Sequence, residues 1–117
     1  MRIKSGNLNL KMDNRKLYEL HAQLCEAFTS PKRLEILNLL QDKELSVMEF
    51  IKLTGMRQSN ISQHLSILRE KGIVKTRREG TAVYYSLSNP KIIKAFNIMK
   101  EILKESIEEK DKITSKW

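Results

Sequence analysis

The residues with the clearest chemical potential form one polar run in the second half of the chain. This run, from Gln58 to Ser66, carries amide or hydroxyl groups at most positions. Such side chains can form hydrogen bonds with base edges, and an amide can pair with adenine through two bonds. A solvated helix face is the alternative interpretation. The candidate residues are Gln58, Ser59, Asn60, Ser62, Gln63, His64 and Ser66, with a structural or backbone role favoured for His64.

Cations flank this polar run. Phosphates require positive charges held beside a groove, and the chain has a formal net charge of +8, which favours an anionic partner. The alternative is a charged loop that only aids solubility. The candidates for phosphate contact are Arg57, Arg69, Lys75, Arg77 and Arg78, together with Thr81.

Periodic apolar residues predict the helices that position these groups. The short third helix begins with a capping box at Ser46 and Glu49, and Gly55 suits the turn that follows it. Ser30 and Pro31 are typical of a helix start. We expect helices over about Asp13–Phe28, Pro31–Leu40, Val47–Leu53, Gln58–Lys71 and Lys91–Glu109.

A β-hairpin is predicted between the last two helices. Val83, Tyr85 and Leu87 alternate with polar neighbours, and Ile73–Arg77 can pair with them across a turn at Glu79–Thr81. The order is therefore α-α-α-α-β-β-α, a mainly α protein with a small β-hairpin (class α+β). A short helix, a glycine turn, a longer helix and a basic hairpin are typical of a winged helix-turn-helix.

The expected organisation is one domain. We assign residues 13–110 to this winged helix-turn-helix domain, residues 1–12 to a basic mobile tail, and residues 111–117 to a frayed C-terminus. The apolar runs are too short to span a membrane.

Four segments resemble the ArsR/SmtB family of winged-helix repressors. They are residues 30–37, 58–65, 68–74 and 78–87, of which the Ser-x-His-Leu stretch and the Glu-Gly…Tyr-Tyr-Ser-Leu hairpin are the more specific. The resemblance covers about Phe28–Leu103. It implies a homodimer built on the first and last helices, and binding to an operator that a metal or an oxidant often relieves.

The chain departs from the family pattern in two places. Residues 44–49 contain no cysteine and the last helix contains no histidine, so the usual metal sites of the family are absent. We therefore expect no cofactor, and the effector is left open. Arg57 stands where family members often place a capping serine; Ser59 is an alternative cap, and Arg57 an alternative phosphate contact.

The first and last helices carry more apolar residues than a three-helix core with a hairpin needs. A two-fold dimer would bury the excess and place two recognition helices about 34 Å apart, which selects an inverted repeat. Packing within one subunit is the alternative. The expected interface residues are Leu17, Leu20, Leu24, Phe28, Ile92, Phe96, Met99 and Leu103.

One cysteine and few histidines limit the other functions. Cys25 fits a reducing cytoplasm, and with His21 four residues earlier it is a candidate metal or redox sensor; filling of the dimer seam is favoured. No nucleophile–base–acid set or phosphate loop is evident, so an enzyme is not expected. We predict a cytoplasmic repressor that binds double-stranded DNA, with an architectural or RNA-associated protein as the alternative.

Overall fold

Five helices and three strands make up the described part of the chain. The computed structural model describes residues 14–115, with side chains for residues 14–111, so the expected tail at residues 1–12 lies outside it. The elements are α2 (Asn14–Glu26), α3 (Pro31–Leu40), β1 (Leu45–Ser46), α4 (Val47–Thr54), α5 (Gln58–Glu70), β2 (Val74–Glu79), β3 (Ala82–Leu87) and α6 (Lys91–Ser115).

Local signals start and end the helices as predicted. The Ser30 hydroxyl accepts a hydrogen bond from the Arg33 amide at 3.3 Å, with Pro31 opening α3. At α4 the Glu49 amide donates to Ser46 at 3.3 Å, and the Ser46 amide donates back to the Glu49 carboxylate at 2.9 Å. Gly55 ends α4 with a φ of 73°, a conformation that favours glycine. These short-range bonds confirm the capping box and the glycine turn.

The sheet has one strand more than the predicted hairpin. Its order is β1-β3-β2, all antiparallel, with Leu45 opposite Tyr85 and Ser46 opposite Tyr84. Strand β1 has only two residues, too few for an alternating pattern, which is why the sequence did not reveal it. It joins the hairpin directly to the start of α4.

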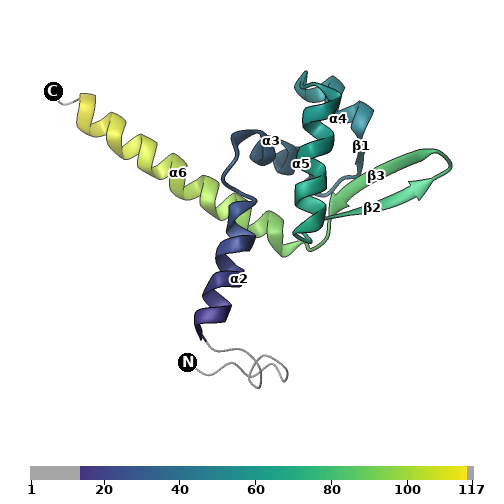
Figure 1. Ribbon diagram of the computed structural model, residues 1–117. Helices are drawn as coiled ribbons and strands as arrows, with labels where there is room; N and C mark the ends of the chain where they lie inside the picture. Colours follow the sequence, from purple (N-terminus) through teal and green to yellow (C-terminus); the bar gives the residue numbers. More distant parts are fainter. Residues whose placement is uncertain (1–13, 116–117) are drawn as a thin grey trace.

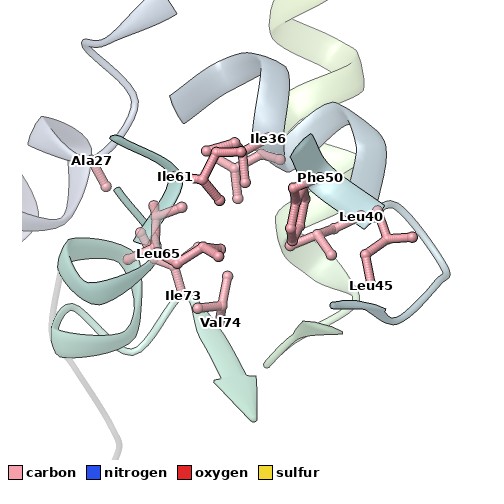
Figure 2. Close-up of a cluster of buried hydrophobic side chains, with 11 residues drawn as sticks. Ala27, Ile36, Leu40, Leu45, Phe50, Ile61, Leu65, Ile73 and Val74 are labelled. Atoms are coloured by element: carbon pink, nitrogen blue, oxygen red, sulfur yellow. The ribbon is translucent and has the colours of Figure 1, made fainter. Parts of the chain in front are cut away.

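One apolar core holds α3, α4 and α5 against the sheet. Figure 2 shows its side chains converging between these elements. Three side chains of α5 spaced three or four residues apart are fully buried, so this helix can turn only one face inward. The buried residues are Ala27, Ile36, Leu37, Leu40, Leu45, Phe50, Ile61, Leu65, Leu68, Ile73 and Val74.

Helix α2 is attached to this core mainly at its C-terminal end. No residue of Asn14–Glu26 is buried. The Arg33 guanidinium donates to the carbonyl of Ala27 at 3.0 Å and to that of Glu26 at 3.4 Å, and the Lys71 ammonium donates to the carbonyl of Gln23 at 3.0 Å. Cations at these last carbonyls also complement the dipole of the helix.

Helices α2 and α6 project away from the body formed by α3, α4, α5 and the sheet, and the β2–β3 hairpin extends on the other side (Figure 1). Helix α6 continues to Ser115, beyond the expected end near Glu109, and so includes residues placed in a frayed terminus. Its sequence has no glycine or proline to stop it. Within residues 14–115, no helix has the length and apolar character that crossing a membrane requires.

Replacing Leu65 with alanine tests the core. We expect the free energy of unfolding to fall by about 2–5 kcal/mol, because apolar burial is reduced and a cavity is left behind. Urea unfolding followed by circular dichroism at one protein concentration measures this change. Ser66→Ala, at an exposed neighbour on α5, is the control and should change the value by less than about 0.5 kcal/mol. An equal loss of unfolding free energy in the two variants would contradict the observed orientation of α5, in which Leu65 is buried and Ser66 is exposed.

Candidate nucleic-acid interface

The outward face of α5 is polar. Because Ile61, Leu65 and Leu68 point into the core, the opposite side of the helix faces solvent. Arg57 is the N-cap residue of α5, and its side chain forms no capping hydrogen bond. Asn60 is half-buried at the edge of the exposed face. The exposed candidates are Arg57, Gln58, Ser59, Ser62, Gln63, Ser66 and Arg69.

His64 differs from its neighbours on α5. Its side chain is half-buried, and the Nδ1 atom is buried with no hydrogen-bond partner among the described residues. Burial lowers the pKa of the imidazole below its ordinary value, and the positive charges of Arg33 and Lys32 lower it further. Because the ring is half-buried with a buried Nδ1 atom, it turns partly toward the protein, whereas its neighbours Gln63 and Ser66 are exposed.

Arg77 does not extend freely from the hairpin. Its guanidinium binds the Glu44 carboxylate at 2.9 Å through Nε and the Glu79 carboxylate at 2.8 Å through Nη1. It also lies over the Tyr84 ring, 4.9 Å from the centroid. The hydrogen bond that Arg77 donates to Glu44 holds the pKa of Glu44 below its usual value, and the bonds that Arg77 donates to Glu44 and Glu79 raise its own pKa. This candidate for phosphate contact is already paired.

The other hairpin residues expected to contact phosphate are exposed to solvent. Lys75, Arg78 and Thr81 are exposed, and no carboxylate within residues 14–111 forms an ion pair with Lys75 or Arg78. Arg78 stands opposite Val83, whereas Arg77 stands opposite Tyr84. Since successive strand residues point to opposite faces, Arg77 and Arg78 leave the sheet on different sides. The sequence could not distinguish these two arginines.

The eight expected interface residues divide into two groups. Phe28, Ile92 and Phe96 are partly buried and pack against the core of their own chain, and Leu17 is half-buried. The others remain exposed: Leu20 at 38%, Leu24 at 46%, Met99 at 65% and Leu103 at 59%. Further exposed apolar side chains on the same helices were not among the expected interface residues. They are Tyr18, Ile98, Ile102 and Ile107, and a wider helical stripe would have included the three isoleucines.

His21 and Cys25 are both exposed on α2. Their spacing of four residues places them on one side of the helix, as expected. No group of three or more histidine, cysteine or acidic side chains suited to a metal occurs in the described part of the chain. Their role as a sensor stays a prediction.

The chain is similar to known regulators. Residues 30–76 match the family model described as bacterial regulatory protein, arsR family. The HTH-type transcriptional regulator Rv0081 of Mycobacterium tuberculosis is 36% identical over 79% of this chain and 82% of that protein. Its crystal structure matches with a TM-score of 0.74 at 34% identity, covering 80% of this chain and 95% of that chain.

Two further similar proteins are described as a homodimer and as a repressor, respectively. The solution structure of the homodimeric winged helix-turn-helix DNA-binding domain Mb0332 of Mycobacterium bovis matches with a TM-score of 0.75 at 30% identity, covering 86% of this chain and 94% of that chain. The transcriptional repressor PagR of Bacillus anthracis is 41% identical over 61% of this chain and 72% of its own length. The predicted fold class, a winged helix-turn-helix, is confirmed.

His64 should make stability depend on pH. Its pKa is lower in the folded than in the unfolded chain, so the unfolded chain binds more protons as the pH falls below about 6.5. The stability that this group contributes is complete above that pH and is lost as the pH falls through the folded pKa. Urea unfolding of wild type and His64→Gln at pH 7.5 and 5.5 measures the effect. We expect the free energy of unfolding to change less between the two pH values in His64→Gln than in wild type. An equal change in both proteins would show that His64 is not the group responsible. His21→Gln, at an exposed histidine, is the control.

Proposed function

The chain belongs to the ArsR family of bacterial regulatory proteins, which are DNA-binding transcriptional regulators and not enzymes, and from this premise we propose a repressor that binds an inverted-repeat operator as a homodimer. The observation that carries the proposal is the polar face of α5, turned outward by the burial of its opposite face. The repressor PagR supports the direction of regulation. A cytoplasmic location is part of the proposal, since a regulator of this kind must reach DNA.

Helix α5 is proposed to read bases in the major groove. It follows α4 across the turn at Gly55, which is the arrangement of a recognition helix. Gln58 and Gln63 offer amides, and Ser59, Ser62 and Ser66 offer hydroxyls, on its exposed side. Such groups discriminate between base pairs through hydrogen bonds.

Phosphate contacts are proposed for the free cations around this helix. Arg57 and Arg69 stand at the two ends of α5, and Lys75 and Arg78 lie on the hairpin that follows it. Each is exposed, so its charge can reach a phosphate without breaking an ion pair within the described chain. Contacts of this kind orient a protein on DNA but do not read its sequence.

A homodimer is proposed through α2 and α6. Both helices project from the body (Figure 1), and both present large apolar side chains to solvent. Covering these with the same helices of a second copy would remove apolar surface from water and set two α5 helices on one DNA face. The homodimeric M. bovis domain supports this arrangement. The alternative, an architectural or RNA-associated protein, would have little sequence preference.

Selection of duplexes from a random pool tests the function. We expect an enriched inverted repeat, and Gln63→Ala should lose about 1–3 kcal/mol of discrimination at one base pair per half-site. Asn38→Ala is the control, because Asn38 is an exposed amide on α3 that contacts Gln41 and Lys100. Fluorescence anisotropy with selected and scrambled duplexes provides the affinities. Equal affinity for both duplexes in wild type would favour the architectural alternative, and increased transcription of a reporter would contradict repression.

Leu103→Glu tests the dimer. Leu103 is 59% exposed in one chain, and two unpaired carboxylates inside an interface should weaken self-association by about a hundredfold or more. Sedimentation velocity measures the dissociation constant. The control is Leu53→Glu, at a leucine of similar exposure (56%) on α4, which should leave the dimer intact. Unchanged association of Leu103→Glu would exclude this part of α6 from the interface.

A further inference from the structure

We propose that Arg77 positions the β2–β3 hairpin and does not bind a DNA phosphate. With Glu44, Glu79 and the Tyr84 ring it forms a set of contacts that we call the hairpin strap. The proposal rests on the proposed function, because it divides the cations of the hairpin into those that meet DNA and one that holds the hairpin in place.

Two carboxylates hold the Arg77 guanidinium. Its Nε atom donates to both oxygens of Glu44 at 2.9 and 3.2 Å, and Nη2 donates to Glu44 Oε1 at 3.0 Å. Its Nη1 atom donates to Glu79 at 2.8 Å. All three nitrogens are therefore engaged by carboxylates, and the Tyr84 ring lies against the planar group. A phosphate could reach only the remaining N–H groups of Nη1 and Nη2, and it would do so beside two carboxylates.

The hairpin strap crosses the sheet. Glu44 directly precedes β1, and Arg77 lies on β2, so the contact crosses the central strand β3. Ser46 of β1 both pairs with Tyr84 and caps α4. The strap therefore joins the hairpin to the first helix of the helix-turn-helix. Since β1 pairs through only two residues, a contact beyond its end adds to a short ladder.

Arg77 and Arg78 lie on opposite faces of the sheet. Tyr85 and Leu87 pack against the core, and strand alternation puts Arg78 on that same face, with Arg77 and Lys75 on the other. Lys75 differs from Arg77 in having no ion pair within residues 14–111. Arg78 thus leaves the sheet toward the side of the helices. Moving Arg77 to a phosphate would also leave two uncompensated carboxylates, Glu44 and Glu79, next to a polyanion.

The salt dependence of DNA binding separates the two roles. Wild type, Arg77→Ala, Arg77→Lys, Arg78→Ala and Glu44→Gln are titrated with the selected duplex at several KCl concentrations, after circular dichroism has shown each variant folded. For Arg78→Ala we expect the slope of log affinity against log salt to decrease by about 0.9 for each phosphate that the variant no longer neutralises. For Arg77→Ala we expect an unchanged slope with affinity lowered about three- to fivefold, the scale of an exposed ion-pair network.

Two substitutions should change the affinity for DNA differently, depending on whether Arg77 binds a phosphate or positions the hairpin. Glu44→Gln removes a negative charge, so it would tighten binding if Arg77 were a phosphate ligand; we expect weaker binding, because the strap is broken. Arg77→Lys keeps the charge but removes the bidentate fork, so it should behave like Arg77→Ala. The proposal would be overturned by tighter DNA binding of Glu44→Gln or by an affinity of Arg77→Lys equal to that of wild type. A smaller slope of log affinity against log salt in Arg77→Ala would overturn it as well.

Hydrogen exchange in the free protein keeps this test separate from the proposed function. We expect Glu44→Gln and Arg77→Ala to accelerate exchange at the β2–β3 amides to a similar degree, with no further increase in the double variant and none in Arg78→Ala. Additive effects, or none, would overturn the strap even if DNA binding is as proposed. Failure of wild type to prefer the selected duplex would overturn the function and leave the strap to be judged by exchange.

Discussion

The burial of one face of α5 is the constraint on which the rest of the structure depends. Ile61, Leu65 and Leu68 are fully buried against residues from α3, α4 and the start of the sheet. Rotating the helix would expose these side chains and bury amides and hydroxyls without partners, which is costly in both respects. The orientation of the polar face is therefore a consequence of core packing. A surface for reading DNA needs this rigidity, because hydrogen bonds to base edges depend on direction.

Charge is distributed unevenly around this fixed helix. Of the two adjacent hairpin arginines, one is paired with carboxylates and the other forms no ion pair with any carboxylate of residues 14–111. Net charge by itself would count both as contributing to DNA binding. Cations elsewhere also have internal partners: Arg33 and Lys71 hold carbonyls of the segment that ends α2. A positively charged surface thus contains both cations that can bind a ligand and cations that bind groups of their own chain.

Helices α2 and α6 serve a different purpose from the core helices. Their ends nearest the body are anchored by Ala27, Ile92 and Phe96, and their outer parts expose apolar side chains such as Met99 and Leu103. An isolated chain gains little from that exposed surface. Under the proposed function, the same two helices would set the distance between two recognition helices, so assembly and operator spacing would have one structural origin.

The residue pattern was enough to predict the helices, the caps of α3 and α4, the glycine turn and the main hairpin, because these depend on periodicity and on bonds between residues three or four positions apart. It also indicated which side chains of α5 face outward. Tertiary structure alone decided that β1 pairs with β3, that Arg77 meets Glu44 across 33 positions, and that the His64 ring lies near α3. It also divided the apolar stripes of α2 and α6 into buried and exposed parts. Such pairings depend on how distant segments pack, and the residue types alone allow many partners.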